Sequence, residues 1–277
     1  MKQVLAFVVF VALVGAFLLP GACTSSAVTG REQLLLFSPS VMDRIGSQTY
    51  AEMTGPGSKA RLLSDAAQVA PLLEVGAAIA AAAAQPGYAW EFRLIDAPGT
   101  ANAFALPGGR IAFYTGIYPV LQDRAGMAIV MGHEVMHAVL QHGNERMSQA
   151  VLAQLGLVAA DFVLEDNKHK AEIMAALGVG VQLGVMLPYS RAHETEADEQ
   201  GLYLAARAGF DPQAAIGVWE RMAALGKGDR PPELLSTHPD PLTRIEAMRA
   251  WMPRALELYA ASTKQPNSPL VLASAAK

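Results

Sequence analysis

The 277-residue chain has a single cysteine, Cys23, which excludes an intrachain disulfide and a metal site built from several cysteines. Charged residues are also few: they make up 17% of the chain against 52% hydrophobic residues, a composition too apolar for a disordered protein. Basic residues are not in excess, because 21 Lys and Arg stand against 25 Asp and Glu. The net charge of -4 provides no positive field for a polyanion, so we expect no nucleic-acid partner.

The first 22 residues have the pattern of a secretory signal peptide. Lys2 is followed by an uncharged apolar run from Val4 to Leu19 and by small residues before Cys23. The run has 16 residues, whereas a membrane-crossing helix needs about 20. The sequence LPGAC resembles a bacterial lipobox, although Pro20 stands where that pattern has leucine or another aliphatic residue. We expect cleavage before Cys23 and lipidation of its thiol; ordinary cleavage with a free thiol and an uncleaved anchor are the alternatives.

The rest of the chain reads as one α+β domain, mostly α-helical, with flanking segments. An alanine-rich stretch from Lys59 to Gln85 predicts a helix that Pro71 kinks or breaks. The runs WEFRLI and GRIAFY predict two strands of one small sheet, and the periodicity beyond Ile117 is helical almost to Tyr259. We therefore divide the chain into a signal peptide (1–22), a lipid-anchored tether with a short helical pattern (23–58), a globular domain (59–260) and a flexible tail (261–277).

A second apolar segment, from Ala171 to Leu187, is hydrophobic on every side of a helix. Its 17 residues are marginal for a membrane span. We expect this segment to form a buried or membrane-facing hairpin with the segment from Gln149 to Leu164.

The sequence HEVMH, from His133 to His137, lies inside a helical stretch from Gly126 to Gln141. The i, i+4 spacing places both imidazoles on one face of a helix, where they can bind one metal ion. Imidazole nitrogens suit zinc, and Glu134 is placed to take a proton from a metal-bound water. The pattern is short and recurs by chance, so a surface helix with two histidines is the competing interpretation.

A catalytic zinc ion needs a third protein ligand. Downstream, SRAHETEAD begins a helical pattern in which Glu194, Asp198 and Gly201 share one face. Small residues on this face let two helices approach closely, which would bring Glu194 to the metal and Asp198 to the free N–H of a ligating histidine. The competing interpretation is a solvated acidic helix start, which suits Glu196 and Glu199.

HEVMH followed by SRxxExEAD resembles the family of zinc metallopeptidases that contains the heat-shock protease HtpX, the CAAX prenyl endopeptidase and the periplasmic proteases BepA and LoiP. The segments VTGREQLLL, NAFALPGGRIAFYTGI, LPYSRAHETEAD and STHPDPLTRI are all similar to the periplasmic lipoprotein branch of that family. The resemblance implies a zincin-like domain with a small sheet that has an exposed edge strand. It also implies one zinc ion per chain, held by His133, His137 and Glu194.

Two further segments acquire roles from the resemblance. In the family, the strand-like segment NAFALPGGRIAFYTG borders the substrate cleft. Asn102, Ala103 and Phe104 would then bind an extended polypeptide by backbone pairing; plain sheet core is the alternative. His238 matches a histidine that approaches the metal from a loop, and Arg244 matches an arginine near the cleft. The resemblance implies that Arg244 or His238 acts in catalysis by helping to stabilise the oxyanion. His238 would then either inhibit, by taking the place of the water, or act in catalysis; a turn held by two prolines is the structural alternative.

The resemblance implies a zinc-dependent endopeptidase of the bacterial envelope that degrades misfolded or misassembled periplasmic and outer-membrane proteins. The alternative function is a chaperone-like assembly factor for outer-membrane proteins with little or no proteolysis; an intact Glu134 favours catalysis. We expect polypeptide substrates and a periplasmic location with an N-terminal lipid in a membrane. Thr24, directly after Cys23, favours the outer membrane.

Overall fold

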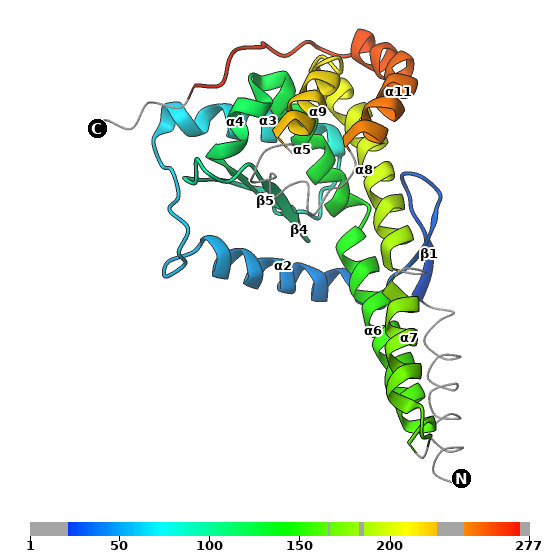
Figure 1. Cartoon of the computed structure of the whole chain (residues 1–277). Helices are drawn as coiled ribbons and strands as arrows, with labels where there is room; N and C mark the ends of the chain where they lie inside the picture. The colour runs from blue at the N-terminus through cyan, green and yellow to red at the C-terminus, as the bar shows by residue number, and fades with distance from the viewer. Residues whose placement is uncertain (1–21, 166, 183–185, 226–240, 272–277) are drawn as a thin grey trace. The chain divides into compact units, whose positions relative to one another are not determined.

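The computed structural model describes residues 22–165, 167–182, 186–225 and 241–271 (Figure 1). The chain divides into two compact units that alternate along the sequence. Unit 1 takes the residues up to Met42 and residues 140–193, and unit 2 takes residues 43–139 and those from Glu194 onward. Helices predominate and the strands form two small sheets, so the predicted α+β, mostly helical fold class is confirmed. The predicted domain boundaries stay a prediction.

Unit 2 contains a three-stranded sheet with the strand order β3-β5-β4. β3 (Glu91–Ile95) runs parallel to β5 (Arg110–Tyr114), and β4 (Ala103–Leu106) pairs with β5 in the antiparallel direction. The two predicted strands are therefore present as β3 and β5. The first four residues of β5 are buried, as befits the central strand, and β4 lies at an edge of the sheet.

The helix α3 (Ala66–Ala83) begins later than the sequence predicts. Asp65 caps its first turn by accepting a hydrogen bond of 3.1 Å from the backbone nitrogen of Gln68. Before the cap, Leu63 donates its backbone N–H to Leu94 of β3, so pairing with the sheet replaces the predicted first turns. Within the described part of the chain, α3 is the one helix long and apolar enough to cross a membrane, a test that the core helix of a soluble protein also passes.

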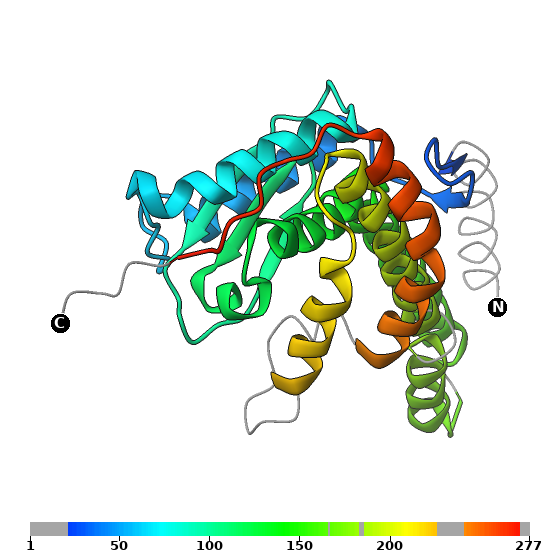
Figure 2. The same ribbon diagram turned by 90° about the horizontal axis from the view of Figure 1, so that it is seen from above.

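The helix α5 (Arg124–Val139) is the most deeply buried helix of unit 2, since every residue except the first and last is buried. It contacts α3, β4, the short helix α4 (Tyr118–Leu121) and α9 (Ala214–Leu225). The 3-10 turn η1 (Thr115–Ile117) leads from β5 into α4. α11 (Pro241–Ala261) packs along α9, and Figure 2 shows these two helices side by side in yellow-orange and orange.

Within the predicted flexible tail (261–277), residues 267–270 form hydrogen bonds with residues 122–125. The Leu270 backbone N–H donates to the carbonyl of Gln122 at 2.8 Å, and the Arg124 backbone N–H donates to the carbonyl of Ser268 at 3.1 Å. The Asn267 side chain adds a hydrogen bond to the backbone at the start of α5. Backbone and side-chain hydrogen bonds thus hold residues 267–270, and a hydrophobic pattern does not reveal such contacts.

Unit 1 contains the described part of the N-terminal segment and the predicted helical hairpin. The antiparallel strands β1 and β2 pair Cys23 with Leu34. The helices α6 and α7 pack against each other and lie side by side in Figure 1. Two helices, α2 and α8, continue from unit 1 into unit 2. The bounds are β1 (Cys23–Ser25), β2 (Glu32–Leu34), α2 (Pro39–Thr54), α6 (His142–Val163), α7 (Lys170–Val181) and α8 (Leu187–Arg207).

Candidate metal centre

Two histidine side chains of α5 lie against each other. His133 and His137 are one turn apart, and their Nε2 atoms are 3.0 Å apart. Their exposed fractions are 4% and 7%, so neither belongs to a surface helix face. The spacing in the sequence therefore brings two ring nitrogens to one buried point.

The carboxylate of Glu194 reaches the same point from α8. Its two oxygens lie 3.5 Å from His133 Nε2 and 3.4 Å from His137 Nε2. One potential ligand atom from each of the three side chains lies within 4.8 Å of the others, and all three side chains are buried. Two imidazoles and one carboxylate form the donor set of a catalytic zinc site, with a fourth position left for water. These residues fit a zinc ion.

Two glycines let α8 approach α5 closely enough for this arrangement. A Cβ atom added to Gly201 would lie 2.7 Å from the His133 backbone nitrogen, and one added to Gly132 would lie 2.6 Å from the carbonyl oxygen of Gly201. Both neighbours are backbone atoms, so no side chain can move aside. The close approach predicted from Gly201 is present. The matching requirement at Gly132 was missed, although its place directly before HEVMH is a signal.

Asp198 lies one turn after Glu194 on α8 and holds His133. Its Oδ1 is 2.9 Å from His133 Nδ1, the ring nitrogen that does not face the other ligands. Arg244 of α11 donates to the same carboxylate through Nε at 2.7 Å and Nη2 at 2.5 Å, and its Nη1 lies 3.6 Å from Glu194. A carboxylate on Nδ1 fixes the imidazole tautomer and leaves Nε2 free to bind a metal.

Trp219 of α9 supports this arginine. The Arg244 guanidinium carbon lies 3.5 Å from the centroid of the Trp219 ring, which is 1% exposed. A planar guanidinium stacked on an indole is held both by packing and by cation–π attraction. The role of Trp219 was missed, because the contact joins two helices and leaves no local signal in the sequence.

The electrostatics of the cluster favour a bound cation. Burial opposes ionisation of Asp198, but the charge of Arg244 and the hydrogen bond from His133 outweigh it and lower the pKa of this carboxyl. Burial likewise opposes protonation of His133, but hydrogen bonds with Asp198 and Glu194 raise its pKa to about 9. Without metal, His133 therefore carries an extra proton at neutral pH. A zinc ion at Nε2 would displace that proton.

The remaining predicted site residues lie in three places. Glu134 is buried in α5, next to the histidine ligands in sequence, with 2% exposure. β4 begins at Ala103 and continues through Phe104, directly after the buried Asn102, and this edge strand contacts α5. His238 lies outside the described residues.

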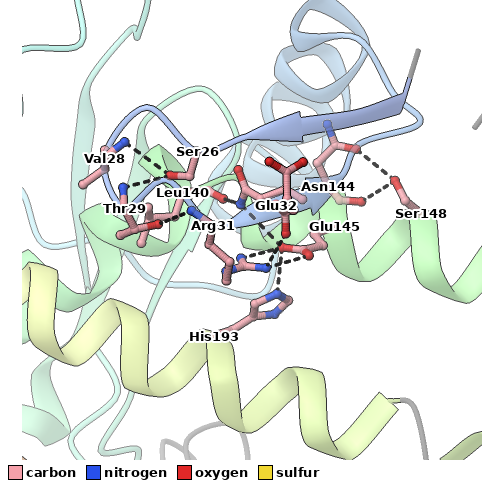
Figure 3. A network of polar contacts seen from close by, with 11 residues as sticks. Ser26, Val28, Thr29, Arg31, Glu32, Leu140, Asn144, Glu145, Ser148 and His193 are labelled. Atoms are coloured by element: carbon pink, nitrogen blue, oxygen red, sulfur yellow. Dashed lines mark hydrogen bonds and ion pairs between the residues drawn. The ribbon is translucent and has the colours of Figure 1, made fainter. Parts of the chain in front are cut away.

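Unit 1 holds a second buried polar cluster, shown in Figure 3, that was missed in the sequence. Arg31 donates to both oxygens of Glu145, at 2.9 and 2.7 Å, and His193 Nε2 lies 2.9 Å from Oε2. His142 stacks on His193 with 4.3 Å between ring centroids. Burial alone would raise the pKa of Glu145, but the hydrogen bonds from Arg31 and His193 lower it to about 2. Through Glu145, these hydrogen bonds hold the segment after β1 against α6 and against His193 of α8.

A helix that carries HEVMH, joined by a glutamate from a second helix, defines the metal centre of a zinc metallopeptidase. The chain belongs to peptidase family M48, whose model matches residues 66–252. The predicted family is confirmed, and this family uses zinc.

Similar proteins include mitochondrial and bacterial members. The chain is 38% identical to the mitochondrial metalloendopeptidase OMA1 of Saccharomyces cerevisiae over 180 residues, which cover 62% of this chain and 50% of that protein. It is 33% identical to OMA1 of Bos taurus over 247 residues, which cover 84% of this chain and 46% of that protein. It is 30% identical to the β-barrel assembly-enhancing protease of Escherichia coli over 155 residues, which cover 53% of this chain and 31% of that protein. The matched part of the chain thus spans half or less of the length of each of these relatives. These similarities do not place it in the predicted periplasmic branch.

Proposed function

We propose that the protein is a membrane-attached zinc endopeptidase that cleaves polypeptides, and that it works in quality control of a bacterial envelope. The observation that carries this proposal is the buried convergence of His133, His137 and Glu194, with Glu134 adjacent in the same helix. Membership of family M48 supports it. A purely structural zinc site does not require a buried carboxylate between its histidine ligands.

The chain supplies the proton transfers and the orientation. When bound, zinc would polarise the scissile carbonyl and make a bound water more acidic. Glu134 would take the proton of the attacking water and deliver it to the leaving amine, so that the base and the later acid are one carboxyl group. Asp198 keeps the Nδ1 proton of His133 in place through the 2.9 Å contact, and Arg244 holds Asp198. Both act by positioning a ligand.

The edge strand β4 is the part of unit 2 best suited to hold an extended substrate. It pairs with β5 on one side in the described sheet, and it contacts α5, the helix that carries the histidines. A polypeptide added as a further strand would be recognised through its backbone, which suits unfolded substrates of varied sequence. The same edge could bind unpaired strands without cleaving them, which is the chaperone-like alternative.

The variant Glu134→Gln separates catalysis from binding. It should retain zinc and lose cleavage of an unfolded protein such as casein, by about a hundredfold or more, because the amide cannot accept the proton. Glu220→Gln, at a 57% exposed position of α9, is the matched control and should cleave normally. Undiminished cleavage by Glu134→Gln would reject the proposed mechanism. Absence of cleavage by the zinc-loaded wild type, with retained binding of unfolded chains, would favour the chaperone-like function.

The envelope location rests on the signal pattern and on Cys23, which is exposed in β1. We expect the mature protein to begin at Cys23 and to carry lipid there, in the periplasm and in a membrane, with the outer membrane favoured. Mass spectrometry of the N-terminal peptide from the membrane fraction tests this. An unmodified cysteine, or retention of residues 1–22, would exclude the lipid anchor.

A further inference from the structure

The hairpin of α6 and α7 has exposed apolar side chains, whose contact with water is unfavourable. None of the twelve residues of α7 is buried, although the sequence from Ile173 to Val181 contains no charged or strongly polar side chain. Leu177 and Val179 are 40% and 58% exposed. A helix that is hydrophobic on all sides is normally covered by protein or by lipid.

The neighbouring helix presents a continuous apolar stripe. Val151, Leu155 and Val158 are 40%, 43% and 45% exposed, and their spacing of four and three residues places them on one face of α6. The half-buried Phe162 continues the stripe one turn later. Both helices of the hairpin therefore leave large apolar groups uncovered within unit 1.

Charged residues lie at the ends of this apolar region and not within it. No charged residue stands between Arg146 and Asp161, a stretch of 14 residues. As a helix this stretch is about 21 Å long, shorter than the hydrocarbon core of a bilayer at about 30 Å. At the connection between the helices Asp161 forms an ion pair of 2.9 Å with Lys170. A hairpin with charges at both ends and none between suits a position along a membrane surface, where both ends stay among the headgroups.

The membrane attachment proposed for the N-terminus would be in the same unit. Whether the anchor is lipid on Cys23 or the apolar run from Val4 to Leu19, it joins the described chain at β1. The bidentate pair of Arg31 with Glu145 binds the segment after β1 to the first turn of α6 (Figure 3). Gln33 of β2 donates to the Leu140 carbonyl at 2.6 Å. The anchor therefore holds the start of α6 near the bilayer, which lowers the entropic cost of a second contact.

We propose that the apolar face of the α6–α7 hairpin inserts into the headgroup–acyl boundary of the membrane that holds the N-terminus. The occupant of this face is lipid. From His142 to Val181 the sequence has three basic and five acidic residues, so the hairpin has no excess of positive charge with which to select anionic lipids. Burial of apolar side chains drives the contact, and neutral phosphatidylcholine suffices.

Photo-crosslinking in the intact protein tests the occupant. The photoreactive residue benzoylphenylalanine replaces Leu155 or Val179 in the purified full chain, reconstituted in vesicles of phosphatidylcholine. Leu256 of α11, an apolar residue that is 37% exposed in unit 2, is the matched control. We expect lipid adducts at both hairpin positions with a yield at least about tenfold above the control, and the same yield when phosphatidylglycerol is added.

Several outcomes would overturn the proposal. Adducts with a second copy of the chain, adducts with residues 4–19 of the same chain, or no adducts at all would each show that lipid does not cover this face. Hydrogen exchange of the unsubstituted protein provides a second measurement that needs no variant: vesicles should slow exchange in α6 and α7, and unchanged exchange contradicts the proposal.

The proposal rests on the membrane attachment proposed above but not on catalysis. A protein that does not float with vesicles lacks the attachment itself. A protein that floats without forming lipid adducts at Leu155 and Val179 has an anchor but no inserted hairpin. Cleavage of casein, measured in parallel, reports separately on the proposed protease.

Discussion

Replacing Asp198 by asparagine removes one negative charge from the metal centre and leaves the side-chain shape almost unchanged. Asp198 accepts hydrogen bonds from His133 at 2.9 Å and from Arg244 at 2.7 and 2.5 Å, and it is 2% exposed. Asparagine has one acceptor oxygen and turns an NH₂ group toward these donors. The Asp198→Asn variant must therefore lose at least one of the hydrogen bonds to His133 and Arg244, and the bonds that remain come from a neutral acceptor.

Two effects of this substitution can be estimated. Loss of the partner of a ligating histidine typically weakens metal binding by about 10- to 100-fold. Breaking a buried ion pair typically lowers the free energy of unfolding by about 3–5 kcal/mol, and we expect the lower end because Glu194 remains 3.6 Å from Arg244. Zinc affinity is measured by competition with a chromophoric chelator, and stability by denaturant unfolding in the presence of a chelator.

Glu199→Gln provides the control, since Glu199 follows Asp198 on α8 and interacts with Tyr203 of the same helix. It removes the same charge from the same turn, at a residue that interacts with Tyr203 and not with the carboxylate that holds His133 and Arg244. Wild-type zinc affinity together with wild-type stability in Asp198→Asn would show that the carboxylate does not support the ligand. Equal losses in both variants would point to a general charge effect.

Three further outcomes follow from the structure. Gly201→Ala should lower the free energy of unfolding by about 1–3 kcal/mol, because the added methyl group meets the His133 backbone. Gly156→Ala is the control: Gly156 has open space around it on α6, so this substitution should leave the free energy of unfolding unchanged or raise it in the same denaturant titration. Ionised Glu145 contributes to the free energy of unfolding in full above its unfolded pKa near 4.5, and this contribution is lost as the pH falls toward 2. The Glu145→Gln variant should therefore have a free energy of unfolding about 1–3 kcal/mol lower than the wild type at pH 7. This free energy should also decrease less in the variant than in the wild type when the pH is lowered. Because the pKa of His133 is about 9 without metal, zinc affinity should rise by about tenfold per pH unit between pH 6 and 8, whereas a pH-independent affinity would show that no proton is displaced.

The sequence predicted correctly those features that depend on residues close together in the chain. The i, i+4 spacing of His133 and His137 fixes their shared face in any regular helix, and the strands around WEFRLI and GRIAFY follow from composition. Glu194 required one additional step, the small Gly201 on the same face of its helix, which permits close packing. Helix starts were less accurate, because pairing of Leu63 with β3 replaced the first predicted turns of α3.

Contacts between distant parts of the chain were not predictable in the same way. Trp219 lies on a different helix from Arg244, and nothing in its neighbours distinguishes a platform for a guanidinium from an ordinary core residue. Arg31 and Glu145 are 114 residues apart and meet only because the segment after β1 reaches α6. Both pairings are decided by tertiary packing, which periodicity does not contain.

The most direct test of the metal centre is the X-ray absorption spectrum at the zinc K edge of the purified protein, with the zinc content measured on the same sample. We expect one zinc ion per chain, surrounded by two imidazole nitrogens and by oxygen atoms at about 2.0–2.2 Å, from Glu194 and water. The Glu194→Ala variant should lose most of its zinc. A sulfur ligand, a shell without imidazole, or full zinc content in Glu194→Ala would contradict the site formed by His133, His137 and Glu194.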